Sequence, residues 1–263
     1  MSKNAFRVIS TALLLSLALS VGGCAKAQKP PVTATYLSQQ VADPLEPMNR
    51  AIFGFNDVVD QALIEPLAKG YVALLPQFMR DAVRNFMRNL QAPVDVANDL
   101  LQGRFNNAGV ATARFVINST VGIAGLVDVA AKKDLKYKDE DFGQTLASWG
   151  VGNGFYLVLP IIGPSTLRDA TGTFADAYAD PVRMWSYNTH RYWVYYTREA
   201  IQGLDTRSRL LKPVDDMRKN SLDYYAAARS AYIQHRNAVI RTNAPAATAP
   251  ASAPEQGLGS DHP

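Results

Sequence analysis

Cysteine and histidine are scarce in this chain of 263 residues. The single cysteine, Cys24, excludes an intrachain disulfide and any metal site that needs several cysteines. His262 falls near the C-terminus, while His190 and His235 stand in helical patterns without a partner that suggests a catalytic triad or a metal pair. We expect these histidines to be exposed or at an interface, and we expect no metal site and no cofactor.

The motifs of common enzymes are also missing. The sequence has no Gly-x-Ser-x-Gly nucleophile elbow, no phosphate-binding loop and no dinucleotide-binding fingerprint. Carboxylates such as Asp57, Asp60 and Asp169 are present, but their spacing does not select a pair for acid–base catalysis. We therefore expect a protein that is not an enzyme.

No block of one charge stands out. Lysine and arginine total 27 against 23 aspartates and glutamates, which gives a net charge of +4 without a clustered basic face. Binding to nucleic acid needs such a face, so we expect no nucleic-acid partner. The mild positive excess still permits a weak attraction to anionic lipid headgroups.

The N-terminal apolar run is too short for a transmembrane helix. Residues 8–20 are apolar and rich in leucine, with Lys3 and Arg7 before them and the small residues Val21-Gly22-Gly23 after them, an order typical of an export signal. The run covers about 15 residues, whereas a bilayer crossing needs about 20. This length favours a signal peptide at 1–23 over an uncleaved anchor.

The sequence Val21-Gly22-Gly23-Cys24 resembles the lipobox of bacterial lipoproteins, in which the cysteine thiol receives a diacylglycerol and the cysteine becomes the new N-terminus. The resemblance implies lipidation of Cys24, with fatty acids such as palmitate as the anchor. In the resembled lipoproteins an aspartate after the cysteine retains the protein in the inner membrane, so Ala25 favours the outer membrane. Each buried methylene contributes about 0.8 kcal/mol, and several acyl chains therefore make a durable anchor.

Composition divides the rest of the chain into three parts. Residues 24–42 are polar and contain Lys29-Pro30-Pro31, which predicts a lipidated flexible tether. Residues 243–263 are rich in alanine and proline and contain too little apolar surface to fold, which predicts a disordered tail. The folded body is expected at 43–242.

Apolar residues of the body recur at spacings of three and four, which predicts an all-α fold. Asp43-Pro44 and Asp180-Pro181 have the pattern of a helix start, with an aspartate cap and proline in the first turn. We expect the first helix to end at Pro66, the second to break at Pro93, and the next to stop at Gly103. Toward the C-terminus we expect one helix from residue 182 to Gly203 and another long helix after Pro213.

Three segments do not look like ordinary helix. Residues 115–127 carry no charge, which fits a buried core helix or a re-entrant segment. Residues 132–141 carry four lysines and four acids, which predicts a solvated loop. Residues 185–196 hold two tryptophans and four tyrosines, which fits either an aromatic core face or side chains at the level of lipid headgroups.

Residues 142–172 form the most unusual segment. Six glycines and two prolines forbid a continuous helix, yet residues 155–162 are strongly apolar. Such a loop is costly to expose to water. We expect it to pack on the body, insert into lipid or line a cavity for an apolar ligand.

Several motifs of the body resemble the MlaA (VacJ) family of outer-membrane lipoproteins. The opening motif is Asp43-Pro44-Leu45-Glu46, then Asn49-Arg50 and Phe53-x-Phe55-Asn56. The middle motif runs from Asn118-Ser119-Thr120-Val121-Gly122 to Ala130, and the longest signature runs from Asp141-Phe142-Gly143-Gln144 to Thr166-Leu167-Arg168-Asp169. The resemblance covers about residues 43–211.

The resemblance implies a ring-shaped, all-helical lipoprotein that lies in the inner leaflet of the outer membrane, faces the periplasm and encloses a central amphipathic channel. It implies a trimeric outer-membrane porin as a partner, and phospholipids that pass from the outer leaflet through the channel to a periplasmic carrier protein, so that lipid asymmetry is maintained. Phe55, Asn56 and Asp57 match the ridge segment that governs the channel. The segment that matches a gating hairpin contributes Phe142, Gly143, Gly150, Gly152, Gly154, Leu159, Pro160, Gly163 and Pro164.

Two other functions stay open at this point. A phospholipase or acyltransferase anchored in the same membrane would release or transfer a labelled fatty acid. A structural lipoprotein that only holds porins would lose porin binding, and keep lipid asymmetry, when residues 142–164 are changed.

Overall fold

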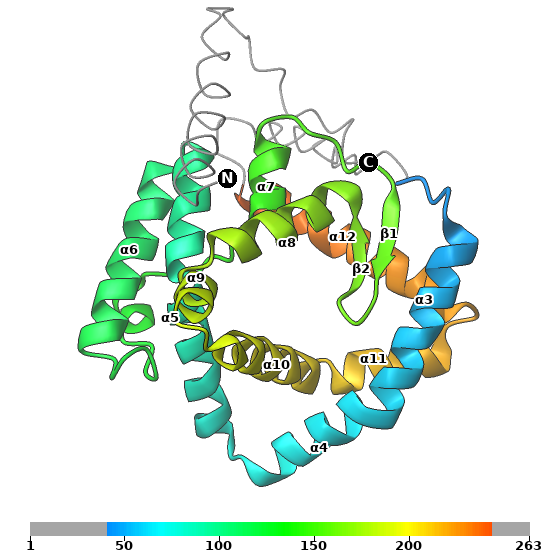
Figure 1. Ribbon diagram of the computed structural model, residues 1–263, viewed down its shortest axis with the longest axis horizontal. Coiled ribbons are helices and arrows are strands. Elements are labelled where there is room, and N and C mark those ends of the chain that lie inside the picture. Colours follow the sequence, from blue (N-terminus) through cyan, green and yellow to red (C-terminus); the bar gives the residue numbers. More distant parts are fainter. Residues whose placement is uncertain (1–40, 244–263) are drawn as a thin grey trace, which may run out of the picture. The chain divides into compact units, whose positions relative to one another are not determined.

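The structure is a computed structural model that describes residues 41–243, all within one compact unit. It is mostly helical, which confirms the all-α prediction (Figure 1). Cys24, the expected signal peptide and nearly all of the expected tether and tail lie outside the described residues. The elements are α3 (Glu46–Val59), the π-helical turn η1 (Asp60–Ile64), α4 (Glu65–Leu74), α5 (Gln77–Leu101), α6 (Phe105–Thr120), the 3₁₀ turn η2 (Ala130–Lys133), α7 (Phe142–Ser148), β1 (Tyr156–Leu159), β2 (Gly163–Thr166), α8 (Leu167–Ala179), α9 (Pro181–Asn188), α10 (Tyr192–Arg209), α11 (Leu211–Asn220) and α12 (Tyr224–Asn243).

The expected break at Pro66 is wrong, because the helix continues to Leu74. Proline in a regular helix clashes with the carbonyl four residues earlier. Here the wider turn η1 directly precedes it, with the Glu65 amide donating to the Asp60 carbonyl five residues back. A π turn of this kind gives the proline ring room without ending the helix.

The expected break at Pro93 is wrong as well, since Pro93 lies inside the long helix α5. An interior proline costs about 3 kcal/mol. Ala92, Val94 and Asp95 around it are buried, and α5 packs along α6, so tertiary packing outweighs that cost. The stop near Gly103 is confirmed, and Gly103 has the left-handed φ of +72° that ends many helices.

The first helix begins at Glu46, slightly later than the pattern at Asp43 suggested. At the other end of the chain, Asp180 caps α9 as expected, accepting a hydrogen bond from the Val182 amide at 2.7 Å. The single helix expected from residue 182 to Gly203 is instead α9 and α10, separated by a turn where His190 has a φ of +56°. The long helix expected after Pro213 is likewise two helices, α11 and α12.

Packing contacts between elements form a closed circuit. The helix α3 contacts β1, β1 pairs with β2, and β2 leads into α8. From there α8 contacts α9, α9 contacts α10, and α10 contacts α4, which continues back through η1 to α3. This circuit can be followed in Figure 1. The helices α5, α7, α11 and α12 pack on its members, and α6 packs on α5.

Burial in this fold is inverted relative to an ordinary globular domain. Among the described residues, polar and charged side chains outnumber apolar ones in the buried set, and Asp95, Asn98 and Asp99 are at most 2% exposed. Large apolar side chains are instead widely exposed. Within residues 41–243, the one buried apolar cluster is small and consists of Val41, Tyr156, Val158 and Tyr225.

The uncharged segment 115–127 is not a buried core helix. Its first part ends α6, and the turn that follows exposes Val121 (69%) and Ile123 (66%). Of the helices within 41–243, none combines the length and apolarity that a bilayer crossing requires. Trp185 and Trp193 are also exposed, which rules out the core face for these two rings.

The charged segment 132–141 is only partly solvated. Its lysines are exposed, but Glu140 is 1% exposed and accepts a hydrogen bond from Arg104 at 3.0 Å. The expectation of a fully solvated loop is therefore wrong at its end, where the chain enters α7 and the carboxylates find buried partners.

Candidate functional site

Two asparagines of α3 hold the β1–β2 hairpin. Asn49 donates from Nδ2 to the Tyr156 carbonyl at 3.1 Å and accepts from the Val158 amide at 2.9 Å. Asn56 donates from Nδ2 to the Leu159 carbonyl at 2.9 Å and accepts from the Ile161 amide at 2.7 Å. We call these four hydrogen bonds the asparagine clasp.

The clasp works because a carboxamide carries one donor group and one acceptor, like a peptide unit. The backbone groups of an α-helix interior are already paired with one another, so a strand that packs on a helix can be held only by side chains. The clasp brings together two segments that the sequence singled out separately, the region of Asn56 and the apolar part of 142–164.

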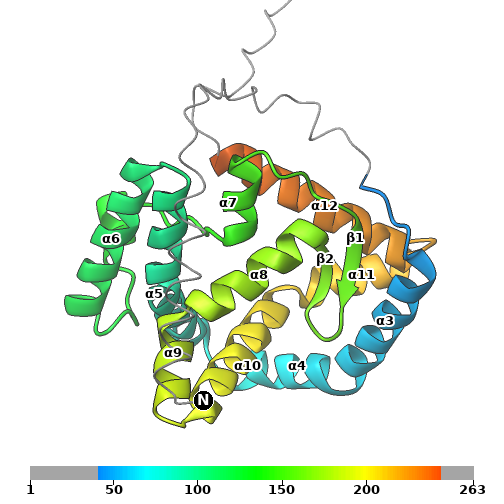
Figure 2. The ribbon, with the colours of Figure 1, turned by 45° about the horizontal axis from the view of Figure 1, so that its top comes forward.

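The hairpin is antiparallel, with Leu159 opposite Gly163 and Val158 opposite Pro164. Pro160, Ile161 and Ile162 form its tip, and the two isoleucines are 70% and 63% exposed. Figure 2 shows the hairpin beside α3 with its tip pointing away from α12. The base is buried, whereas the tip presents apolar side chains outward.

The tip of the hairpin carries backbone strain. Ile161 has a φ of +67°, which is rare for a β-branched residue and costs about 1–3 kcal/mol. The Ile161 amide is the group that Asn56 accepts from. The clasp therefore stabilises a strained tip as well as the position of the hairpin.

Phe55 and Asp57 flank the clasp residue Asn56 but make different contacts. Phe55 is 55% exposed. Asp57 accepts from Arg218 of α11 at 2.8 Å, next to a cluster in which Asp60 and Glu65 pair with the same arginine. Burial opposes ionisation of Asp60, but hydrogen bonds and charge from Arg207 and Arg218 outweigh it and lower its pKa. These ion pairs fix α11 to the helical segment that carries the clasp.

The expected gating segment 142–164 is not one loop, because its first part is the helix α7. Asp141 caps α7 by accepting from the Gln144 amide at 2.8 Å. Phe142 donates its backbone amide to Asp176 of α8 at 2.7 Å. Gly143 is buried where α7 meets α8, and a Cβ on Gly172 of α8 would stand only 2.3 Å from the Gly143 nitrogen. The two glycines thus allow a backbone contact that no larger residue permits.

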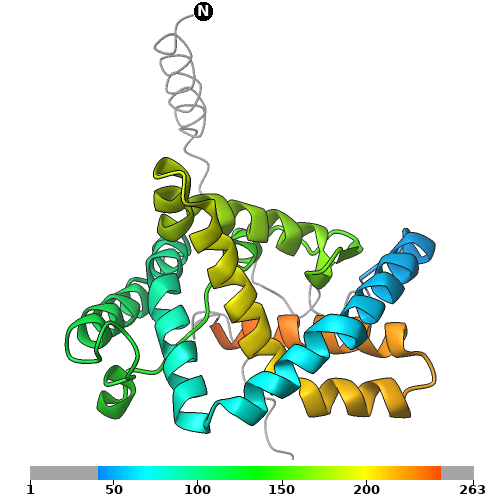
Figure 3. The same cartoon turned by 60° about the horizontal axis from the view of Figure 1, so that its bottom comes forward.

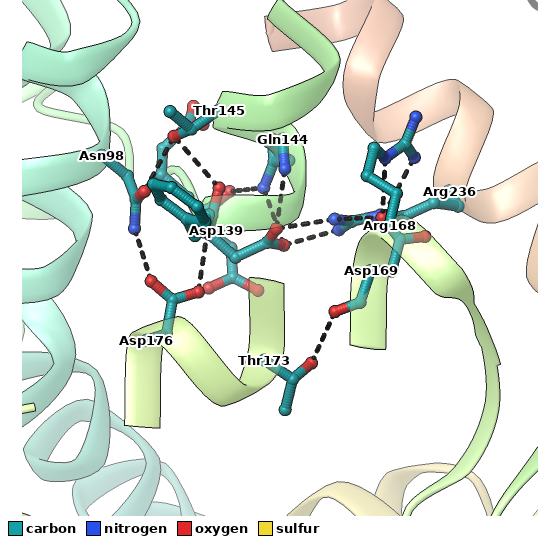
Figure 4. A network of polar contacts seen from close by, with 12 residues as sticks. Asn98, Asp139, Gln144, Thr145, Arg168, Asp169, Thr173, Asp176 and Arg236 are labelled. Carbon is teal, nitrogen blue, oxygen red and sulfur yellow. Dashed lines mark hydrogen bonds and ion pairs between the residues drawn. The ribbon is translucent and has the colours of Figure 1, made fainter. Parts of the chain in front are cut away.

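A buried polar network surrounds this helix contact (Figure 4). Arg236 of α12 donates to Asp141 at 2.6 Å and to Asp169 at 3.0 Å. Arg168 donates to Asp169 at 3.0 Å, and Asn98 of α5 donates to Asp176 at 2.9 Å. The network links four helices, α5, α7, α8 and α12, through charge-assisted hydrogen bonds, which are stronger than neutral ones.

The carboxylates of the network differ in their ionisation. Burial opposes the charge on Asp141 and Asp169, but Arg236 outweighs it and holds both pKa values below the ordinary range. Burial raises the pKa of Asp176 to about 6, because the Phe142 amide and Asn98 offset it only in part. Around pH 6, therefore, protonation of Asp176 changes the charge of the network by one unit.

Comparison with known proteins identifies the chain. Residues 41–239 match the family described as MlaA lipoprotein. The chain belongs to the MlaA lipoprotein family. The resemblance found in the sequence motifs is therefore confirmed, and the match extends beyond them into α12.

Individual relatives of this MlaA-family chain agree. It is 34% identical to the intermembrane phospholipid transport system lipoprotein MlaA of Escherichia coli, over 74% of this chain and 77% of that one. It is 34% identical to the protein of the same name from Haemophilus influenzae, over 87% and 88% of the two chains. An uncharacterized protein of Rickettsia bellii is 40% identical over 77% of this chain and 78% of its own.

A solved structure from work on the structural basis for maintenance of bacterial outer membrane lipid asymmetry superposes on this chain with a TM-score of 0.66. It is 35% identical, and the match covers 76% of this chain and 99% of the other.

Sequence reasoning located only part of the site in this MlaA-family chain. Gly150, Gly152 and Gly154 lie exposed in the connection between α7 and β1 and form none of the hydrogen bonds of the clasp. Asn49 belonged to a recognised motif without an assigned role, although its spacing of seven residues from Asn56 places both on one helical face. Nothing near Arg236 in the sequence signals its two acidic partners, which are distant along the chain.

Proposed function

We propose that this protein transports phospholipids between membranes as an outer-membrane lipoprotein anchored through Cys24. In this proposal it removes misplaced phospholipids from the outer leaflet and passes them to a periplasmic carrier protein, and so maintains lipid asymmetry. The proposal draws support from the relatives in Escherichia coli and Haemophilus influenzae, which are named as intermembrane phospholipid transport lipoproteins. The related solved structure, from work on lipid asymmetry, supports it further.

The observation that carries the proposal is the inverted burial. A phospholipid headgroup that crosses hydrocarbon leaves its water shell at a cost of many kcal/mol. A path lined with polar groups lowers that barrier without covalent chemistry. A body with buried polar networks and exposed apolar side chains fits a place in the apolar part of a membrane, with the polar side turned toward the lipid headgroup.

The closed circuit of packing contacts is our basis for proposing a ring with a central amphipathic channel that lies in the inner leaflet and faces the periplasm. Phe55, Asn56 and Asp57 form the ridge beside this channel. The hairpin is the gate, with Leu159, Pro160, Gly163 and Pro164 at its moving end, and the asparagine clasp holds it in one position. Phe142 and Gly143 anchor the neighbouring helix, and Gly150, Gly152 and Gly154 supply a flexible connection.

The proposed partners are phospholipids, a trimeric outer-membrane porin beside the ring and the periplasmic carrier. The proposed organisation is a signal peptide at 1–23, a lipidated tether at 24–42, the helical body at 43–242 and a disordered tail at 243–263. The protein is proposed to act without covalent chemistry on the lipid.

The test is the amount of phospholipid in the outer leaflet of a deletion strain. Deletion is expected to raise it, and the parent chain is expected to restore it. Asn56→Ala, which removes half of the asparagine clasp, is expected to alter the amount of phospholipid in the outer leaflet at equal protein abundance. Gln61→Ala is the matched control, because it removes an exposed carboxamide from the same helical segment, where it only donates to Asp57.

An unchanged amount of outer-leaflet phospholipid in the deletion strain would contradict the transport proposal. Loss of porin binding with intact asymmetry after substitutions at 142–164 would instead favour a structural role. Release of labelled fatty acid from phospholipid by the purified chain would favour an anchored lipase.

A further inference from the structure

An apolar groove lies where α5, α9 and α10 meet, away from the hairpin. Its volume is about 490 Å³. Figure 3 shows α10 running from the end of α9 past α5. Nearly all of its wall is apolar and includes Phe86 and Leu90 of α5, Val182 and Trp185 of α9, and Trp193 and Ile201 of α10.

The groove is open and its tryptophans are not covered by the protein. Trp185 is 46% exposed and Trp193 is 68% exposed. Exposed apolar surface that surrounds a groove marks a binding site for an apolar group. Tryptophan also prefers the boundary between hydrocarbon and headgroups, because its ring is apolar and its N–H is polar.

One cation stands beside the groove. The Arg191 guanidinium lies over the ring of Trp185, which lines the groove, 5.8 Å from its centroid. Within residues 41–243, Arg191 forms no salt bridge.

The buried arginine in the groove wall behaves differently. Arg198 is 4% exposed and is bound by the Asp180 carboxylate and by Gln91 Oε1 at 2.9 Å. The charge of Arg198 is thus neutralised within the fold, whereas the charge of Arg191 is not. A groove of this kind combines an apolar trough with positive charge at its edge.

We propose that this groove binds one phospholipid molecule, with an acyl chain in the trough and the phosphate at Arg191. Charge complementarity favours this occupant over the apolar face of a protein, since arginine forms strong hydrogen bonds with phosphate oxygens. The inference goes beyond the proposed transport function, because it concerns a lipid held by α5, α9 and α10 and needs no movement of the hairpin.

Tryptophan fluorescence tests the proposal directly. The chain has three tryptophans, so Trp149→Phe leaves only the two that line the groove. We take the full chain with this change, in detergent micelles without bromine, and add phosphatidylglycerol brominated at mid-chain. Bromine quenches tryptophan on contact. Quenching is expected to reach a plateau at equimolar lipid.

Two substitutions in that background locate the lipid. Val194→Phe places an aromatic ring in the groove wall, where it fills the trough, and is expected to abolish the plateau. Val116→Phe is the matched control, because Val116 is an exposed valine of α6 and lies away from the groove. Arg191→Gln is expected to raise the apparent dissociation constant about tenfold, as loss of one hydrogen bond to a charged group predicts. Brominated diacylglycerol, which lacks phosphate, is expected to bind weakly. Its apparent dissociation constant is expected to be the same with and without Arg191→Gln.

Several outcomes would overturn the proposal. Quenching that rises without a plateau, or a plateau that survives Val194→Phe, would mean that no lipid occupies the groove. Equal affinity for brominated diacylglycerol would show that the phosphate does not contribute to binding. Shielding of both tryptophans by a purified trimeric porin, with no lipid plateau, would make the groove a protein interface. Asn56→Ala is expected to keep the plateau, so failure of the transport proposal and failure of this one are distinguishable.

Discussion

Removing the Asn56 carboxamide should release the tip of the hairpin while its base stays in place. Asn56→Ala deletes the two hydrogen bonds to Leu159 and Ile161. Asn49 still holds Tyr156 and Val158, and the buried cluster around Tyr156 is untouched. The expected change is therefore local opening of residues 159–163 and not unfolding of the body.

The size of the effect follows from the environment of the two bonds. A hydrogen bond contributes about 0.5–1.5 kcal/mol net, and the low end applies where water can replace the partner. The bond to the Leu159 carbonyl is partly buried, whereas the bond from the Ile161 amide is exposed. Together they stabilise the closed tip by about 1.5 kcal/mol, which is about tenfold in population. The unfavourable φ of Ile161 adds to the tendency to open.

Amide hydrogen exchange measures this opening residue by residue. The Ile161 amide is expected to exchange about tenfold faster in Asn56→Ala, from the energy derived above. The Tyr156 amide, which donates to the Ala42 carbonyl at 2.9 Å, is the internal reference and should not change. Gln61→Ala should leave both amides unaffected. Unchanged exchange at Ile161 in Asn56→Ala would show that the clasp does not hold the tip.

Three further predictions concern the body. Arg236→Met should cost about 1–3 kcal/mol, because it leaves the half-buried Asp141 carboxylate without its cationic partner. Thermal unfolding measures this, and an unchanged melting temperature would contradict it. Gly172→Ala should abolish folding or lower the melting temperature strongly, since its Cβ meets backbone, while Gly152→Ala, with open space around it, should be neutral. Burial, with Asp139 adding to it, raises the pKa of Asp95 to about 9, so the folded chain keeps a proton there that the unfolded chain has lost. Stability should fall by up to about 1.4 kcal/mol per unit between pH 5 and 8, and equal pH dependence in Asp95→Asn would refute the assignment.

The helical nature of the body was predictable because its physical signals are local. Apolar spacing and the cap at Asp180 lie within a few residues of the helices they specify. The helix ends that were predicted wrongly depend on contacts with residues distant along the chain. Pro66 and Pro93 carry the strongest local signal for a break, yet a π turn accommodates the first and packing on α6 outweighs the second.

The site was predictable as segments but not as contacts. Asn56 and the hairpin residues near Leu159 were both singled out, about a hundred residues apart along the chain. The contact between them is a tertiary one, and no local sequence pattern indicates it. The same holds for Arg236, whose partners Asp141 and Asp169 lie on two other helices. The strand β1 also lacked a local signal, because its side chains alternate between buried and half-buried in the structure while its sequence, Tyr156-Leu157-Val158-Leu159, is apolar throughout.

The spacing of the asparagine clasp explains why one helix can hold one strand at two points. Asn49 and Asn56 are seven residues apart, which is roughly 10.5 Å along a helix axis. From the Tyr156 carbonyl to the Leu159 carbonyl, which accept from the two asparagines, is three residues, or about 10 Å of strand. The two spacings therefore match over the length of β1.

This match also fixes how the hairpin can move. Because each carboxamide binds its own pair of backbone groups, either half of the clasp can open without the other. The half at Asn49 is backed by the buried rings of Tyr156 and Tyr225, while the half at Asn56 faces an exposed and strained tip. The tip must therefore open at lower free energy than the base, so any lipid that passes beside the hairpin needs to displace only the Asn56 half. Equal exchange rates at Ile161 and Val158 in the parent chain would contradict this order.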